Sequence, residues 1–419
     1  MLDPWLNAGL KGYPHGAPPL RRSQVGVQGW NVLAGDLPLP LAVLRQGPLQ
    51  HNLGWMQRLV AAQGIALAPH GKTTMSPQLF QQQLAAGAWG ITFANLQQLA
   101  VGLASGVRRA VIANQVLQAQ DLRHLADLQS RHADLQVMFL LDSAEQLALI
   151  EAEALPRALD VLLELGLDGG RTGCRTHDAA LALARRAHAS AAVRLAGIEC
   201  YEGLWGTGDS AADARMALGL MLRVQALAAA CDAEGLFDTD EVIVTAGGSA
   251  LFDLVAPALK PELSKPVQGL LRSGCYLTHD DGFYRRMVHV ANARMACSDG
   301  EGLRAALQVW CVVQSLPEAG LAILGCGKRD VSFDMGLPVP LLHCPLDSAT
   351  PVAVPEGWNI SALNDQHAYL RTGDAACSLQ VGDRIALGIS HPCTTFDKWR
   401  WMPVVDEACN VVDAITTHF

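Results

Sequence analysis

The stretch Ile65-Ala66-Leu67-Ala68-Pro69-His70-Gly71-Lys72-Thr73 decides how the rest of this chain is interpreted. A short apolar run ends at Pro69 and is followed by a lysine, which is typical of a β-strand that enters a loop. Most lysines after a strand are ordinary surface residues. Here Gly71 permits a close backbone approach and Thr73 adds a hydroxyl. A lysine at the mouth of a β/α domain can form a Schiff base, so Lys72 is a candidate catalytic residue.

The same strand pattern recurs on both sides of this stretch. Between residues 39 and 285, short apolar runs alternate with Ala- and Leu-rich helical runs such as residues 77–86. The predicted strands cover residues 41–44, 66–69, 91–94, 110–113, 137–141, 161–165, 195–200 and 242–245. Eight strands with helices between them predict a (β/α)8 TIM-like barrel, and a doubly wound open sheet is the alternative.

The sequence changes character after residue 286. Helical runs become short, and alternating segments appear at residues 306–314, 321–324 and 384–387 with Gly and Pro between them. This pattern predicts a C-terminal all-β domain over residues 286–419. The first 38 residues show little helical pattern, and we expect this segment to pack on the β domain. A chain of 419 residues is also long enough for two domains.

Composition excludes several classes of protein. The formal charge of −9 argues against a nucleic-acid partner. The 11 cysteines have no regular spacing, which indicates reduced thiols and a cytoplasmic protein. The start of the chain has neither a basic flank nor an apolar run, so no signal peptide is predicted. No uncharged apolar stretch approaches the roughly 20 residues of a membrane span, so no membrane partner is expected.

Two glycine-containing loops are candidates for holding a phosphate group. Thr245-Ala246-Gly247-Gly248-Ser249 follows the last predicted barrel strand, and Arg272-Ser273-Gly274-Cys275-Tyr276 follows later. Consecutive glycines let backbone N–H groups converge on a phosphate, and hydroxyls such as that of Thr245 add donors. Gly-Gly-Ser turns are common in loops. A position after a late barrel strand nevertheless matches the usual phosphate site of barrel enzymes.

Two further strand ends carry polar side chains. Residues 164–173 form a strand end and a Gly-rich loop that contains Arg171, which could bind a phenolate or carboxylate. The other interpretation is a plain turn with a solvated charge. Tyr201 ends the next predicted strand, where it could face a cofactor ring or simply pack as an aromatic cap.

The motif His391-Pro392-Cys393 lies near the end of the chain. Two residues that are two positions apart on an extended segment point the same way, so His391 and Cys393 could hold a soft metal ion. A buried cysteine is more often a small apolar residue, and a single histidine is usually satisfied by a hydrogen bond. Combined with Lys72, the pair suggests pyridoxal phosphate chemistry that is assisted by a Lewis acid.

These motifs together resemble the pyridoxal phosphate enzymes of the alanine-racemase-like fold (fold type III), and most of all the D-serine dehydratase/D-threonine aldolase branch. The resemblance spans most of the chain. It is carried by Pro-His-Gly-Lys-Thr at residues 69–73, by residues 164–173, by Tyr-Glu-Gly at 201–203, by Gly-Gly-Ser at 247–249, by residues 272–276 and by His-Pro-Cys-Thr-Thr-Phe-Asp at 391–397.

The resemblance implies a role for each matching residue. Lys72 would carry the cofactor as a Schiff base. Arg171 would approach the ring hydroxyl oxygen and Tyr201 the pyridine nitrogen. The phosphate would be held by residues in the two glycine-containing loops, namely Thr245, Gly247, Gly248, Gly274 and Tyr276. His391 and Cys393 would bind Zn²⁺, with Mn²⁺ or another divalent ion as an alternative, and the family implies a homodimer.

The function implied is a zinc-dependent ammonia-lyase that converts a D-3-hydroxy amino acid such as D-serine to a 2-oxo acid and ammonia. A metal-dependent D-threonine-type aldolase, which gives glycine and an aldehyde, is the alternative. Because thiolate and imidazole ligands favour zinc over harder ions, the lyase is preferred. A non-catalytic pyridoxal phosphate carrier would not need a metal. A racemase would need a second base opposite Lys72, and the sequence identifies none.

Overall fold

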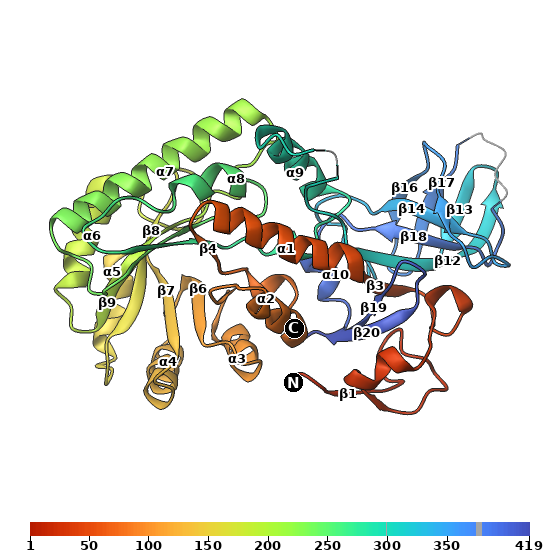
Figure 1. The fold of residues 1–419 in the computed structure, drawn as a ribbon, viewed down its shortest axis with the longest axis horizontal. Helices are drawn as coiled ribbons and strands as arrows, with labels where there is room; N and C mark the ends of the chain where they lie inside the picture. Colours follow the sequence, from red (N-terminus) through yellow and green to blue (C-terminus); the bar gives the residue numbers. More distant parts are fainter. Residues whose placement is uncertain (299, 374–378) are drawn as a thin grey trace.

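The computed structural model describes residues 1–298, 300–373 and 379–419 and contains two large sheets of different kinds (Figure 1). Within the described residues, the first sheet has eight parallel strands in the order β4-β11-β10-β9-β8-β7-β6-β5. The strands are β4 (Ala66–Leu67), β5 (Ile91–Phe93), β6 (Arg109–Gln115), β7 (Gln136–Leu141), β8 (Leu159–Leu165), β9 (Val193–Cys200), β10 (Val242–Ala246) and β11 (Val267–Leu271).

The two ends of this sheet meet and close it into a barrel. The amide of Trp89 donates to the carbonyl of Leu67, and the amide of Thr92 donates to the carbonyl of Pro69 at 2.9 Å. Alternate strand residues such as Val111 and Leu162 point inward and form a separate buried cluster inside the barrel. The predicted TIM-like barrel is therefore confirmed.

Helices cover the outside of the barrel (Figure 1). They are α1 (Gln46–Ala62), α2 (Pro77–Ala85), α3 (Leu96–Ala104), α4 (Ala119–Arg131), α5 (Ala144–Ala152), α6 (His177–His188), α7 (Ser210–Ala233) and the short α8 (Phe252–Val255), with α9 (Phe283–Arg294) leading out of the barrel. Several begin at a side-chain cap. Ser76 accepts a hydrogen bond from the amide of Leu79, and Asn95 accepts one from the amide of Gln98.

Helix α7 is long and apolar enough to cross a membrane by length and composition alone. One side of the helix is buried, including Leu220, Val224 and Leu227. Helix α7 packs on α6 and β9 of the barrel. Its apolar composition is that of a helix covering a barrel wall.

The second sheet is mostly antiparallel. Its main path in the described residues runs β15-β14-β18-β12-β13-β17-β16, and β3, β19 and β20 extend it beside β12. The strands are β3 (Leu41–Arg45), β12 (Leu307–Glu318), β13 (Leu321–Leu324), β14 (Val339–Cys344), β15 (Val352–Ala353), β16 (Asn359–Leu363), β17 (Ala368–Arg371), β18 (Arg384–Gly388), β19 (Trp401–Val405) and β20 (Val411–Thr416). A short helix, α10 (Cys393–Phe396), follows β18.

One predicted strand belongs to the other sheet. The run at residues 41–44 does form a strand, but this strand, β3, pairs antiparallel with β12 and parallel with β19. Strand β11 takes the remaining place in the barrel instead, between β4 and β10. Apolar composition predicts that a buried strand forms, but it does not say which partner the strand will meet.

The N-terminal segment lies beside β19 and β20. Its own short strands, β1 (Trp5–Leu6) and β2 (Leu20–Arg21), pair with each other. The Tyr13 ring contacts the Trp401 ring with centroids 5.5 Å apart, and Arg22 forms an ion pair with Asp413 at 2.5 Å. The domain boundaries proposed at residues 38 and 285 remain predictions.

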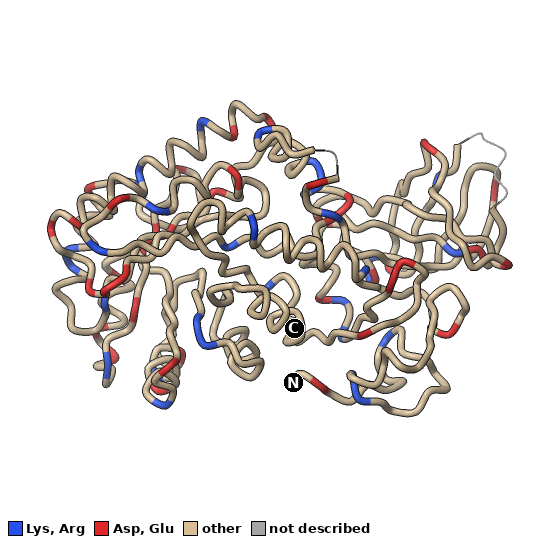
Figure 2. The backbone as a smooth tube through the Cα atoms, viewed as in Figure 1, with Lys and Arg blue, Asp and Glu red and all other residues tan. Residues whose placement is uncertain are grey.

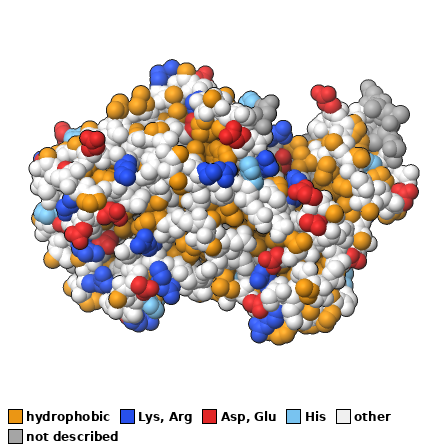
Figure 3. Space-filling view, viewed as in Figure 1, with side chains coloured by type: hydrophobic (Ala, Val, Ile, Leu, Met, Phe, Trp, Pro, Cys, Tyr) orange, Lys and Arg blue, Asp and Glu red, His pale blue; other side chains and the backbone are white. Residues whose placement is uncertain are grey.

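Charged side chains of both signs are spread along the whole chain (Figure 2). The face shown in Figure 3 carries them singly or in small groups, with apolar side chains between them. Basic and acidic side chains are thus interspersed on this face, as expected for a sequence with 31 basic and 40 acidic residues.

Candidate active site

A cavity of about 560 Å³ lies where the loops after the barrel strands meet the segment that follows β18. This volume falls in the range of small-molecule sites. Most of the predicted site residues share this cavity. Those that line it are Lys72, Arg171, Tyr201, Gly247, Gly248, Gly274, His391 and Cys393.

Two predicted phosphate ligands do not line the cavity. The Thr245 side chain is buried and donates a hydrogen bond to the carbonyl of Leu270 at 2.9 Å. The Tyr276 ring is also buried, and its hydroxyl accepts a hydrogen bond from Gln83 at 3.1 Å. Both side chains face the packed structure around the site.

Lys72 lies in a single turn of 3₁₀ helix, η3 (Gly71–Thr73), that directly follows β4. Its side chain is exposed to the cavity, whereas the flanking Gly71 and Thr73 are buried. Gly274 packs tightly against this turn. A Cβ atom on Gly274 would lie 2.6 Å from the carbonyl oxygen of His70 and 2.7 Å from Oγ1 of Thr73. The absence of a side chain at Gly274 therefore allows its loop to lie this close to the turn that carries Lys72.

The Gly247–Gly248 turn is held by a buried carboxylate. Glu202 accepts hydrogen bonds from the amide of Gly247 at 3.0 Å and from the amide of Gly248 at 2.6 Å. These are the two amides that the sequence suggested for a phosphate. Gly247 has φ +103°, and a Cβ atom there would lie 2.3 Å from Leu271. The turn is thus preformed and presents Gly248 to the cavity beside the Tyr201 ring.

The loop that carries Arg171 is fastened at several points. Glu164 accepts a hydrogen bond from Thr172 at 2.7 Å, and Asp142 accepts one from the amide of Gly173 at 3.0 Å. Arg175 donates to the carbonyl of Thr172 at 2.6 Å. These contacts place the Arg171 guanidinium 5.1 Å from the centroid of the Tyr201 ring.

A buried ion pair forms part of the cavity wall. Glu199 lies near the end of β9, and Arg272 directly follows β11, with β10 between the two strands. The two side chains contact each other directly, and both residues line the cavity. Burial raises the pKa of Glu199 to about 8, although the Arg272 charge acts in the opposite direction. Oε2 of Glu199 has no hydrogen-bond partner among the described residues.

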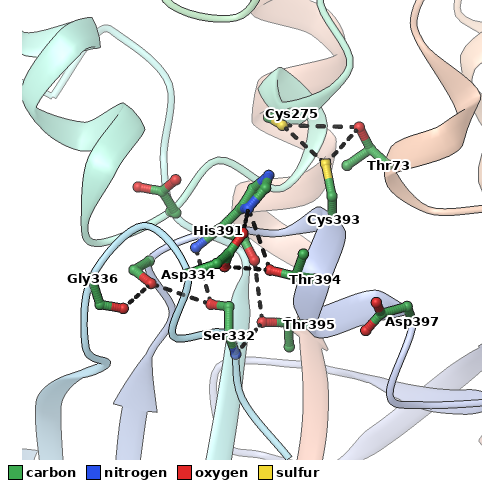
Figure 4. Close-up of polar contacts among 12 residues, drawn as sticks. Thr73, Cys275, Ser332, Asp334, Gly336, His391, Cys393, Thr394, Thr395 and Asp397 are labelled. Carbon is green, nitrogen blue, oxygen red and sulfur yellow. Dashed lines mark hydrogen bonds and ion pairs between the residues drawn. The ribbon is translucent and has the colours of Figure 1, made fainter. Parts of the chain in front are cut away.

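His391 and Cys393 also line the cavity, and Cys393 lies beside Thr73 of the turn that carries Lys72 (Figure 4). The segment is not extended as the sequence analysis assumed, because Pro392 has helical φ/ψ angles and α10 begins at Cys393. The two side chains still converge. They are joined by Cys275 from the barrel, and one ligand atom from each of the three residues lies within 4.8 Å of the others.

The imidazole of His391 is oriented by a carboxylate. Nδ1 of His391 lies 2.7 Å from Oδ2 of Asp334, and Thr394 donates to the other oxygen of Asp334 at 2.7 Å (Figure 4). This arrangement leaves Nε2 for another partner. Burial alone would lower the pKa of His391, but hydrogen bonds to Cys393 and Asp334 raise it to about 9. The neighbouring Cys275 thiol and His391 hold the pKa of Cys393 well below that of an ordinary thiol.

Sequence reasoning missed several residues of the site. Cys275 was named only as part of a loop, since it lies 118 positions before Cys393. Glu199, Glu202 and Asp334 were not singled out as functional. Glu202 could have been found from its position directly after Tyr201, at the expected end of a buried strand. A carboxylate that is buried there needs a polar partner.

A parallel barrel with a lysine at its mouth, joined to an antiparallel sheet that brings a His–Cys pair to the same cavity, defines a class of protein. This is the class of pyridoxal phosphate enzymes with the alanine-racemase-like fold. Comparison of the sequence with known families agrees, and the chain belongs to the family described as "Alanine racemase, N-terminal domain", which matches residues 45–264. Residues 306–405 match a second family, described as "Putative serine dehydratase domain". The predicted family is confirmed.

The curated relatives are lyases. The chain is 27% identical to a D-threonine aldolase of Arthrobacter sp, over 85% of this chain and 86% of the relative. It is 28% identical to a D-threo-3-hydroxyaspartate dehydratase of Delftia sp. (strain HT23), over 86% of this chain and 92% of the relative. A crystal structure of D-threonine aldolase from Filomicrobium marinum has the same fold, with a TM-score of 0.75, 22% identity and coverage of 93% and 97% of the two chains.

Proposed function

We propose that this protein is a pyridoxal phosphate- and zinc-dependent ammonia-lyase that acts on a D-3-hydroxy amino acid. The observation that carries the proposal is that Lys72 and the His391–Cys393 pair line one cavity, although 319 positions separate Lys72 from His391 (391 − 72 = 319). Elimination of water from such a substrate needs a base near Cα and an acid near the β-oxygen. The cavity offers both kinds of group, because Lys72, His391 and Cys393 all line it.

The residues present fit pyridoxal phosphate. Lys72 is exposed to the cavity, and Arg171 and Tyr201 lie together on the wall next to it. Side chains on Gly248 or Gly274 would fill part of this space, because a Cβ atom on Gly248 would lie 3.2 Å from the Tyr201 ring. Lys72 would hold the cofactor covalently, and Gly248 and Gly274 would leave room for its phosphate group. Glu199 also lines this cavity.

The residues also fit a divalent metal ion. His391 and Cys393 supply an imidazole and a thiol whose pKa is lowered, and this donor set favours zinc. A D-threo-3-hydroxyaspartate dehydratase has been solved as a Cys-to-Ala mutant in the metal-free form, which supports a metal site in that protein. Asp334 would orient His391 by accepting from its Nδ1–H, an arrangement common around metal-bound histidines.

The chain's own groups would then divide the reaction. Pyridoxal phosphate, when bound, supplies an electron sink for negative charge at Cα, and the metal supplies a Lewis acid for the β-oxygen. Lys72, which lines the cavity, would accept the Cα proton of the substrate. Arg171 and Tyr201 would hold the orientation of the ring. Loss of the β-hydroxyl as water gives an enamine that hydrolyses to a 2-oxo acid and ammonia.

A D-threonine-type aldolase is the second candidate, and it is favoured by the similarity to the Arthrobacter enzyme. In that reaction a base removes the β-hydroxyl proton and the Cα–Cβ bond breaks, giving glycine and an aldehyde. The same lysine and metal ligands would serve. The two reactions differ in which bond to Cβ is broken.

A product assay separates the two. The purified protein, loaded with pyridoxal phosphate and zinc, is incubated with D-serine, D-threonine and D-3-hydroxyaspartate, and 2-oxo acid, ammonia and glycine are measured together. Equal amounts of oxo acid and ammonia support the lyase. Glycine with an aldehyde would replace it by the aldolase, and no product from any of the three would refute both.

Metal removal tests whether the metal ligands and Lys72 have separate roles. We expect a chelator to abolish ammonia release while leaving the visible absorption of the bound cofactor unchanged, because Lys72 would carry the cofactor covalently and is not itself a metal ligand. We further propose that the protein is a homodimer, as the resemblance to the family implied, and that it is cytoplasmic, as its irregularly spaced cysteines indicated.

A further inference from the structure

We propose that Cys275 is a third protein ligand of the metal, so that the ion is held by two thiolates and one imidazole. This inference rests on the proposed function, which places a metal on His391 and Cys393. The thiolate of Cys275 would be a ligand from the barrel. Its presence would determine how many coordination positions stay open and which type of metal ion the site prefers.

The distance between the two sulfur atoms carries the inference. Sγ of Cys275 lies 3.7 Å from Sγ of Cys393. Two thiolates on one tetrahedral zinc ion, with Zn–S bonds of about 2.3 Å, are about 3.8 Å apart. The two sulfurs are therefore already at the separation that a shared zinc ion requires. A disulfide would need about 2.05 Å, so the observed spacing is that of two free thiols.

Neighbouring contacts hold Cys275 in this position. Its backbone amide donates to Oγ of Ser249 at 3.0 Å, and Gly274 before it packs on the turn that carries Lys72. Oγ1 of Thr73 lies 3.4 Å from the sulfur of Cys393 and 3.9 Å from that of Cys275 (Figure 4). Thr73 can thus donate its hydroxyl hydrogen to one of the thiolates. Cys275 and Thr73 come from the barrel, whereas Cys393 comes from the segment after β18.

The second thiolate changes what the site can do. A Cys₂His set is one of the donor sets of catalytic zinc, and it leaves one position open in a tetrahedral site for a substrate oxygen. Two thiolates also neutralise the charge of a divalent ion. They strongly favour soft or borderline ions such as zinc over manganese or magnesium, which prefer oxygen ligands. We therefore infer that the substrate's β-oxygen occupies a single open position on a zinc ion.

X-ray absorption at the zinc edge counts the ligands directly. The probe is zinc alone, added in stoichiometric amount to the cofactor-loaded protein without substrate. We expect two sulfur atoms at about 2.3 Å and one nitrogen at about 2.0–2.1 Å in the wild type. Cys275→Ser should retain one sulfur and bind zinc at least tenfold more weakly in competition with a coloured chelator. Cys297→Ser, which changes a cysteine outside the cavity, should retain both sulfurs and the wild-type affinity.

A single sulfur in the wild-type spectrum would overturn the inference, as would an unchanged spectrum for Cys275→Ser. The wild-type measurement decides the matter even if the variant fails to fold. This result is separable from the proposed function. One sulfur with metal-dependent product formation would refute the role of Cys275 alone, whereas two sulfurs without any elimination or cleavage would refute the lyase.

Discussion

Gly274 offers a direct test of how closely the two loops of the cavity must approach. In Gly274→Ala the new Cβ atom would lie 2.6 Å from the carbonyl oxygen of His70 and 2.7 Å from Oγ1 of Thr73. An ordinary carbon–oxygen contact is about 3.3 Å or longer. The loop that carries Lys72 and the loop that carries Gly274 must therefore move apart by about 0.7 Å. This movement would strain the backbone hydrogen bonds of both loops.

The expected effects follow from this displacement. Overpacking of this kind costs about 1–3 kcal/mol of unfolding free energy, which lowers Tm by roughly 1–3 °C in a chain of this size. A shift of nearly 1 Å in a catalytic group reduces activity by up to about 100-fold. We expect kcat/KM for product formation to fall by about 10- to 100-fold, with weaker binding of pyridoxal phosphate.

The matched control is Gly219→Ala on α7. Gly219 is an exposed helical residue, and a Cβ atom there would meet no atom within 4 Å. This change should raise stability by about 0.5–1 kcal/mol and leave activity unaltered. The assays are thermal unfolding, titration with the cofactor followed by visible absorption, and product formation. Wild-type kcat/KM and cofactor affinity in Gly274→Ala would show that the close approach is unimportant.

Four further outcomes are expected. Borohydride should fix the cofactor to Lys72, and Lys72→Ala should abolish turnover; a peptide map with the adduct on another lysine would contradict this. Asp334→Asn should weaken zinc binding by about 10- to 100-fold in a chelator competition and leave cofactor absorption intact, and an unchanged affinity would count against its orienting role. Burial raises the pKa of Glu199 to about 8, so the folded state binds a proton that the unfolded state releases. The unfolding free energy should therefore fall as pH rises from about 4.5 to about 8, and this fall should be smaller in Glu199→Gln if the assignment is correct. Sedimentation should give a dimer, and an active species near the monomer mass of 44.6 kDa would exclude it.

The barrel could be predicted because most of its strands are short apolar runs between turn residues. Strand β11 (Val267–Leu271) was missed, since it contains Gln268 and Gly269 and directly follows Pro266. Strand β3 was found but assigned to the barrel. Its pairing with β12 depends on contacts far along the chain, and local composition carries no information about those contacts.

The site was predictable where a motif is local. Lys72 and the His391–Cys393 pair each lie in a short stretch with recognisable neighbours. Cys275 could not be connected to Cys393 from the sequence, because only the packing of the barrel against the segment after β18 brings the two sulfurs to 3.7 Å. Tyr276 was assigned to the phosphate, but its ring turns into the core toward Gln83. The direction of a side chain in an irregular loop depends on backbone angles that composition does not fix.

The place of β3 in the second sheet has a consequence for how the protein is made. Leu44 pairs with Leu307, so 263 positions separate the partners (307 − 44 = 263). At a synthesis rate of roughly 5–20 residues per second, β3 waits about 13–50 s for its neighbour. During that interval four apolar residues that end fully buried, Leu41 to Leu44, form an unpaired edge on the nascent chain. We therefore expect newly made protein to aggregate more readily before β12 leaves the ribosome, and expression at low temperature with chaperones should raise the soluble yield.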